Sequence, residues 1–396
     1  MQTHPAPQRL YFLDWLRIGA FALLVLYHVG MYYVTWTWHV KSPDAGAALE
    51  PFMRLSSPWR LSLLFLISGA ATSFMLLRDG ATARWFGGRS KRLLLPLLFG
   101  MALIVPPQSY FEVVQQHGYA GSYLDFMRLY FTGYGGFCKG ASNCLVLPTW
   151  NHLWFVAYLF VYTALLWLLL RSWPRALDVI AAALARVLRG AAWLWAPIAL
   201  LALLRIALLD RYPPTHALFG DWYLHAIYLG VFVVGAAWAR DAHAWQRCAE
   251  LRWPALLLAL LAWGAMALVT LGAPVWAPWP GRVAFAAMQW SAIVAAIGFA
   301  RVHLNRDHRW RATLAESVFP VYIAHQTLIV LFAVGLRPLH WMPAIEGPML
   351  AALTLATSFG VYLAVRRVPA LRTVFGLNAA AHAPAATAAK VRVSAP

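Results

Sequence analysis

The chain has 396 residues, of which 62% are hydrophobic and only 12% are Asp, Glu, Lys or Arg. Soluble domains carry about 25% charged residues, so this composition excludes a soluble globular protein and indicates an integral membrane protein. The formal net charge of +18 raises the question of a nucleic-acid partner. No patch of interleaved basic and aromatic residues on a soluble domain supports such a partner.

Ten apolar segments of about 20 residues follow one another along the chain, each long enough to cross a hydrocarbon core of about 30 Å. We predict an all-α, polytopic membrane protein with helices at 12–34, 60–78, 92–108, 152–171, 191–209, 222–239, 253–272, 283–301, 316–336 and 347–365. Residues 1–377 are predicted to form a single transmembrane domain with an outer loop at about 109–150. Residues 378–396, rich in Ala and Pro, have little to bury and are predicted to be a disordered cytoplasmic tail.

The distribution of basic residues predicts the orientation in the membrane. When alternate loops are placed on opposite sides, 22 of the 32 Lys and Arg residues fall on the side of the N-terminus. Cytoplasmic loops carry the excess of Lys and Arg, so both termini are predicted to be cytoplasmic. The first apolar segment is too long for a signal-peptide core and lacks a cleavage site, which predicts a retained anchor. We expect a multi-pass protein of the bacterial inner membrane.

The three cysteines fall on both sides of the predicted membrane. Cys138 and Cys144 lie in the predicted outer loop, whereas Cys248 lies on the inner side. Disulfides form in oxidising compartments, so a bond is predicted to be unfavourable for Cys248. Spacing alone does not establish bonding geometry, and the sequence leaves both a bonded and an unbonded Cys138 and Cys144 open.

The first predicted helix carries two ionisable residues, Arg17 and His28, within hydrophobic sequence. Ionisable groups in hydrocarbon are costly and persist where a bundle interior or a wet cavity receives them. Eleven residues make about three full turns, so the two side chains share one helix face, about 16 Å apart along the axis. Asp14 lies on the same stripe. This helix is therefore predicted to form one wall of a polar shaft.

Further polar residues are predicted to lie in layers along this shaft. At its inner entry, Arg89 and Arg92 could bind the phosphates of a nucleotide-type donor, or could act only as a topology signal. The middle layer contains His28, Ser68, Tyr322 and His325. A buried histidine can take a proton from a sugar hydroxyl, although a histidine that only packs and hydrogen-bonds explains the same pattern.

The outer layer holds amide, imidazole and indole groups. Such groups suit a carbohydrate, whose hydroxyls need directional hydrogen bonds while its ring faces stack on aromatic side chains. Helix capping and interface anchoring explain them equally well. The predicted acceptor-binding residues are Trp38, His39, Asn151, His152 and Trp154. The sequence contains no Gly-x-Ser-x-Gly, His-Glu-x-x-His or phosphate-loop motif, and no metal site is predicted.

Several motifs, taken in order, resemble the membrane-bound acyltransferase 3 family. They are Arg17 with His28, Phe65-Leu66-Ile67-Ser68-Gly69, and Arg89-Ser90-Lys91-Arg92 ahead of a proline. Tyr11 to Asp14, Trp36 to Ser42 and His152 to Phe155 are similar to the branch that succinylates periplasmic glucans, and Tyr322 to Gln326 supports the likeness near the other end. The resemblance implies a cytoplasmic acyl-CoA donor, succinyl-CoA or acetyl-CoA, and a sugar hydroxyl acceptor outside. It makes His28 the essential histidine, Arg17 its paired basic residue, and Arg89 and Arg92 the inner arginine pair.

The predicted reaction is therefore O-acyl transfer to a periplasmic or cell-surface glycan. In one form His28 deprotonates the acceptor hydroxyl while Ser68 or Tyr322 hydrogen-bonds the oxyanion, and Arg17 helps to neutralise the donor phosphates. In another form His28 itself carries the acyl group. A transporter or flippase, whose ionisable residues mark a substrate or proton route, and a sensor or scaffold are the alternatives. The acyl group, the glycan and the oligomeric state are left open.

Overall fold

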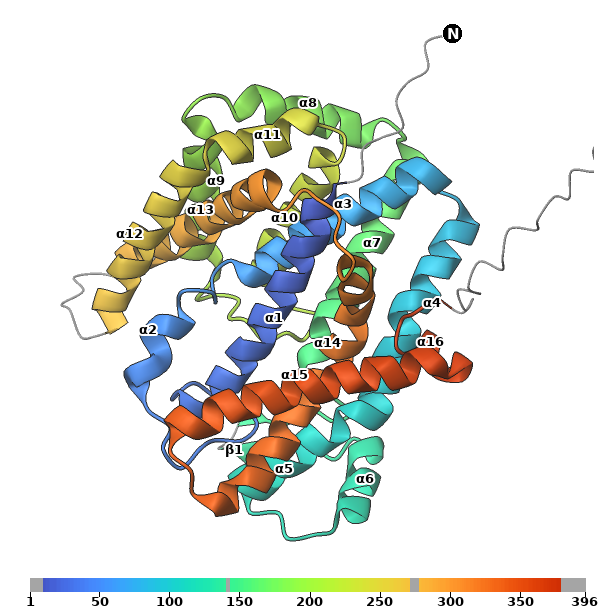
Figure 1. The fold of residues 1–396 in the computed structure, drawn as a ribbon, viewed down its shortest axis with the longest axis vertical. Coiled ribbons are helices and arrows are strands. Elements are labelled where there is room, and N and C mark those ends of the chain that lie inside the picture. Colours follow the sequence, from blue (N-terminus) through green and yellow to red (C-terminus); the bar gives the residue numbers. More distant parts are fainter. Residues whose placement is uncertain (1–9, 140–142, 271–277, 379–396) are drawn as a thin grey trace, which may run out of the picture.

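The structure is a computed structural model that describes residues 10–139, 143–270 and 278–378, and it is a bundle of helices (Figure 1). The predicted tail at 378–396 lies almost entirely outside the described residues. Each of the ten predicted apolar segments coincides with a helix. These helices are α1 (Tyr11–Tyr33), α3 (Arg60–Asp79), α4 (Ala83–Phe99), α7 (Trp154–Ser172), α9 (Ala192–Leu208), α10 (Trp222–Trp238), α12 (Arg252–Thr270), α13 (Trp279–His303), α14 (Arg311–Leu336) and α15 (Pro343–Arg367).

The number of membrane crossings agrees with the prediction. Seven of the described helices are long and apolar enough to cross a membrane, and the number rises to ten if each of three bent helix pairs is one span. Two of these pairs bend sharply, by 107° between α8 (Ala176–Val187) and α9, and by 108° between α10 and α11 (Ala242–Glu250). The prediction of a polytopic, all-α membrane protein is confirmed.

Short elements that the sequence did not predict fill the segments between the long helices. In Figure 1, α8 and α11 lie at one end of the long axis, and α5, α6 and β1 lie at the opposite end. Besides α8 and α11, the short elements are η1 (Ala47–Leu49), α2 (Glu50–Met53), α5 (Pro106–His117), α6 (Tyr123–Thr132), β1 (Cys138–Lys139), β2 (Asn143–Cys144), η3 (Asn151–Leu153), η4 (Arg337–Leu339) and α16 (Pro369–Val374).

The third predicted helix is longer than expected at both ends. A π-helical segment, η2 (Gly100–Ile104), joins α4 to α5, which continues to His117 with a bend of 41°. The predicted start of the outer loop, at about residue 109, therefore falls inside α5, which ends at His117. The polar residues after Pro106 resembled a helix end, but proline is well tolerated in a first helical turn. Side chains satisfy the interrupted backbone, since Thr327 Oγ1 donates to the carbonyl oxygen of Ile104 at 2.6 Å.

The closest helix packing in the bundle is between α3 and α10. A Cβ atom on Gly69 would lie 1.9 Å from the carbonyl oxygen of Phe232, and one on Gly235 would lie 1.9 Å from the carbonyl oxygen of Leu66. Membrane helices associate through such small residues because lipid supplies no hydrophobic drive between them. In the Phe65–Gly69 motif, Gly69 therefore lies directly against the backbone of α10.

The open question about the cysteines is answered by the structure. Cys138 pairs with Cys144 across the antiparallel strands β1 and β2, and a disulfide links the two. Cys248 is free and fully buried.

Candidate active site

A pair of histidines from α1 and α14 lies at the centre of the candidate site. His28 Nδ1 is 2.8 Å from His325 Nε2, and His325 Nδ1 is 2.6 Å from the carbonyl oxygen of Tyr322. A carbonyl can only accept, so His325 carries its proton on Nδ1 and its Nε2 accepts. His28 must then donate through Nδ1, which leaves the lone pair on its Nε2. His325 thus holds His28 in the tautomer that a general base requires.

A second set of polar side chains links the loop after α1 to α5 and α14 beside this pair. His39 Nδ1 donates to the carboxylate of Glu112, and its Nε2 accepts from Gln326 Nε2 at 2.7 Å. Gln326 Nε2 also donates to Gln108 Oε1 at 3.1 Å. His152 Nε2 lies 3.1 Å from the carbonyl oxygen of Ile323. Each donor in this set has an acceptor, so the network is rigid and specifies one arrangement.

The predicted outer-layer residues are part of this network. Gln108 Nε2 lies 3.4 Å from His152 Nδ1, and Asn151 Nδ2 donates to Gln108 Oε1 at 3.1 Å. Both ring nitrogens of His39 and of His152 therefore have partners, and neither ring is available as a base. Among the described residues, His28 Nε2 has no such partner, which singles out His28 among the four histidines His28, His39, His152 and His325.

His28 lines two adjoining cavities. The central cavity has a volume of about 490 Å³, and its walls include all five predicted acceptor-binding residues, Trp38, His39, Asn151, His152 and Trp154. The small cavity has a volume of about 40 Å³ and is walled mainly by apolar side chains, with Tyr322 also lining it. The residues shared by both cavities are His28, Arg60, Leu61, His152 and Trp154. His28 therefore lies at the junction between a large polar space and a small apolar one.

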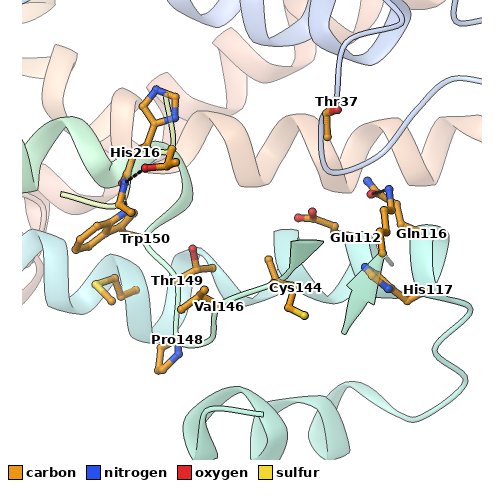
Figure 2. A pocket seen from close by; sticks show the side chains of 15 residues that line it. Thr37, Glu112, Gln116, His117, Cys144, Val146, Pro148, Thr149, Trp150 and His216 are labelled. Carbon is orange, nitrogen blue, oxygen red and sulfur yellow. Dashed lines mark hydrogen bonds between the residues drawn. The ribbon is translucent and has the colours of Figure 1, made fainter. Parts of the chain in front are cut away.

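A third cavity, the vestibule, extends the central cavity toward the disulfide-linked hairpin (Figure 2). Its volume is about 430 Å³, and Glu112, Gln116, Lys139 and Cys144 are among its lining residues. The vestibule and the central cavity share Thr37, Thr149, Trp150, Thr215 and His216. Together the two form a continuous space with mixed polar and apolar walls, and His28 lines its central part.

The unpredicted extension of α5 shapes this space by holding the loop that carries Trp38 and His39. Gln116 Nε2 donates to the carbonyl oxygens of Trp38 and His39, both at 2.6 Å. Lys41 Nζ donates to the carbonyl oxygen of Met31 at 2.6 Å, near the C-terminal end of α1, where a cation is favourable. Burial lowers the pKa of Lys41 to about 8.

Arg60, at the start of α3, is a site residue that the sequence analysis missed. It is 4% exposed and lines both the central and the small cavity. It had been counted as one of the outer basic residues, because it stands at the edge of an apolar segment. Gln108 and Glu112 were missed because they were assigned to the third helix's end and to the outer loop. A polar stripe on a longer third helix is the signal that could have found them.

Asp14 and Arg17 do not join His28 at the site. Asp14 Oδ2 forms an ion pair with Arg311 Nη1 at 2.6 Å, which ties α1 to the start of α14. Arg17 Nη2 donates to the carbonyl oxygen of Ala315 at 3.0 Å. The helix rise of about 1.5 Å per residue separates both residues from His28 by about 16 Å or more. Asp14 and Arg17 therefore lie apart from His28 along α1, and a shared role in the chemistry stays a prediction.

The two predicted oxyanion donors are not placed for that role. The Tyr322 hydroxyl donates to the carbonyl oxygen of His152, and a hydroxyl has only one proton to donate. Ser68 lines neither of the two cavities that His28 lines, because α3 turns the adjoining Gly69 toward α10. Tyr322 instead contributes its ring to the wall of the small cavity and its backbone carbonyl to the His325 hydrogen bond.

The arginines of α4 lie away from both cavities. Arg89 Nε is buried without a hydrogen-bond partner among the described residues, and the charges of Arg92 and Arg17 act on it. Arg92 Nε donates to the carbonyl oxygen of Gly376 at 3.1 Å, beyond α16. The three arginines thus form a cationic cluster where α1 and α4 approach the C-terminal segment. Among the described residues, no group of three or more His, Cys, Asp or Glu side chains is placed to hold a metal ion.

Comparison with known proteins shows which family the chain belongs to. A family model described as an acyltransferase domain, that of the acyltransferase 3 family, matches residues 10–363. Glucans biosynthesis protein C of Escherichia coli strain SMS-3-5 and that of strain K12 are each 30% identical over 168 residues, which cover 41% of this chain and 39% of each relative. The matched part thus spans less than half of those relatives. No solved structure matches the chain. The chain belongs to the acyltransferase 3 family.

Proposed function

We propose that this protein transfers an acyl group, succinyl or acetyl, from cytoplasmic acyl-CoA to a hydroxyl of a periplasmic or cell-surface glucan. The observation that carries the proposal is the position of His28, which lines both the central and the small cavity and whose Nδ1 is held by His325. A sugar entering through the vestibule and an acyl group in the small cavity would meet at this side chain. The glucan as acceptor rests on the names of the bacterial relatives.

In the proposed reaction His28 is the general base. Its Nε2 takes the proton of the acceptor hydroxyl, the oxygen attacks the thioester carbonyl carbon, and the C–S bond breaks. The departing thiolate takes the proton from His28, so ester and free CoA thiol are the products. His325 is a positioning residue, because its hydrogen bond fixes the tautomer of His28 and stabilises the imidazolium that forms. A positioned base of this kind contributes about 10²- to 10⁴-fold to the rate.

The arginine cluster is the proposed donor site. Phosphates are multiply charged, and arginine offers them a fork of hydrogen-bond donors. The cluster lies near the first turns of α1, and His28 is about three turns further along the same helix. An extended pantetheine arm would connect the two, so the acyl group would cross while the nucleotide remained inside. The excess of basic residues on the side of the N-terminus supports this orientation.

Replacing Arg89 with Ala is expected to raise the apparent KM for acyl-CoA about tenfold while changing kcat little. The reason is that a phosphate contact is made equally in the ground state and in the transition state. Initial rates at varied donor concentration measure both constants. Arg84→Ala, an exposed position on the same helix, is the matched control. An unchanged donor KM in Arg89→Ala would leave the α4 arginines as topology residues.

The direct test of the proposed function uses sealed membrane vesicles of both orientations. Inverted vesicles that enclose a neutral glucan and receive labelled acyl-CoA from outside should accumulate acylated glucan in the lumen. Right-side-out vesicles given the same external donor should not. Mass spectrometry of the glucan detects the added acyl group. Product with the reverse sidedness would reject the orientation, and absence of product in both would reject the acyltransferase assignment for this donor and acceptor.

The vesicle experiment also separates the proposed enzyme from a transporter or flippase. A transporter would move glucan or an intermediate without forming a covalent product. The hydrogen-bonded histidine pair favours the enzyme, since a passive route does not need one tautomer of one histidine.

A further inference from the structure

Arg60 carries a buried positive charge without a carboxylate partner among the described residues. Its Nε and Nη1 are buried and lack hydrogen-bond partners. Its guanidinium carbon lies 3.3 Å from the ring centroid of Tyr27, a neutral aromatic side chain. A cation–π contact offsets only part of the cost of removing a guanidinium from water. The side chain is therefore set up to receive an anion.

The small cavity beside Arg60 restricts what that anion can be. A cavity needs about 10–15 Å³ of free volume for each water molecule, so the small cavity, at about 40 Å³, holds roughly three groups of that size. Leu24, Leu64 and Phe155 supply apolar walls. This space fits a short aliphatic chain with a charged end, and it is too small for a sugar ring.

The inference rests on the proposed function, whose two substrates contain few groups that could place a negative charge beside Arg60. The donor phosphates belong at the arginine cluster around Arg89, and the hydroxyls of a glucan are neutral. A permanent anion at the cavity junction must then come from the acyl group itself. The planar fork of a guanidinium also suits a carboxylate, which has two oxygens, better than the single oxygen of a thioester carbonyl.

We propose that Arg60 is the specificity-determining residue that binds the terminal carboxylate of a dicarboxylic acyl group such as succinyl. Two methylene groups would lie against the apolar walls of the small cavity. Arg60 and His28 line the same two cavities, so a thioester held in this way presents its carbonyl carbon near His28. The inference rests on the proposed function and narrows its donor to CoA thioesters with a free carboxylate.

The test compares succinyl-CoA with butyryl-CoA, in which a methyl group replaces the terminal carboxylate. The wild-type protein should prefer succinyl-CoA. Arg60→Met, which keeps the length of the side chain, should lower the ratio of kcat/KM for succinyl-CoA to that for butyryl-CoA about a hundredfold, because it leaves a carboxylate buried without a partner. Arg60→Lys should recover part of the ratio, since it keeps the charge but not the planar fork.

The control is Arg54→Met, which removes another arginine that lies over an aromatic ring, that of Trp36, but lines neither cavity. It should leave the donor ratio unchanged. Equal losses with both donors in Arg60→Met would overturn the proposal, because Arg60 would then act on the reacting carbonyl. A wild-type preference for butyryl-CoA would overturn it without any variant. Transfer from neither donor by the folded wild-type protein would instead reject the proposed function.

Discussion

Replacing His28 with Ala or Gln is expected to lower kcat for acyl transfer by about 10²- to 10⁴-fold, the usual contribution of a positioned general base. Gln fills nearly the same space, but its amide cannot take up the proton of a hydroxyl. Protein abundance and the elution volume in detergent should stay close to those of the wild type, because the substitution removes a single described side-chain hydrogen bond, that to His325. Single-turnover rates with saturating donor and glucan measure the chemical step.

The matched control is His303→Ala, at the exposed end of α13, which should retain full activity. Substantial turnover by well-expressed His28→Gln would remove His28 from the mechanism. The same material distinguishes the two forms of the reaction. Incubation with donor alone, followed by peptide mass spectrometry, should detect no acylated His28 if transfer is direct, whereas a trapped acyl-imidazole would establish the relay.

A substitution where α3 and α10 cross is expected to lower the stability of the protein. Gly235→Ala places a Cβ atom 1.9 Å from the carbonyl oxygen of Leu66, which forces two backbones apart. Overpacking of this kind costs about 1–3 kcal/mol and occasionally more. We therefore expect a lower thermal unfolding midpoint in detergent and less folded protein in the membrane.

Gly230→Ala, on the same helix, is the control for this change. A Cβ atom there has no neighbour within 4 Å, and Ala is a better helix former than Gly by about 1 kcal/mol. This variant should match or exceed the stability of the wild type. If both substitutions lower the midpoint equally, the effect belongs to α10 itself and not to its close contact with α3.

The positions of the long helices could be predicted because crossing the hydrocarbon core requires a run of about 20 apolar residues, which is visible in the sequence. His28 and His325 could be assigned to one layer for the same reason, since depth in the membrane follows from the distance to a helix end. Their direct hydrogen bond could not be predicted, because it depends on how α1 and α14 are rotated against each other. The depth of a residue in the membrane follows from its position within its own helix. The rotation of that helix about its axis depends on packing with every neighbouring helix.

Other contacts between distant segments follow the same rule. Asp14 lies 3.8 Å from Arg17 on the same helix face, but its shorter ion pair is with Arg311, nearly three hundred residues away in sequence. Arg60 resembled a topology signal because a basic residue at the edge of an apolar segment usually faces water. In the structure it is 4% exposed, with the ring of Tyr27 from α1 packed against its guanidinium, and that contact depends on how α1 and α3 are rotated against each other. The extension into α5 was hidden because its polar face is satisfied by the segment that follows α1 and by side chains of η3 and α14, and not by solvent.

The state of the three cysteines gives this protein a practical property. Two are bonded to each other, and the third, Cys248, is completely buried. Reactivity toward thiol reagents requires an accessible thiolate, so the native chain should be nearly silent to maleimides without any cysteine having been removed. A single cysteine introduced at an exposed position, such as Ala183 in α8 or Leu124 in α6, would then be the one reactive thiol. Sidedness, distances between helices and access to the vestibule can all be measured on a chain that is otherwise unaltered.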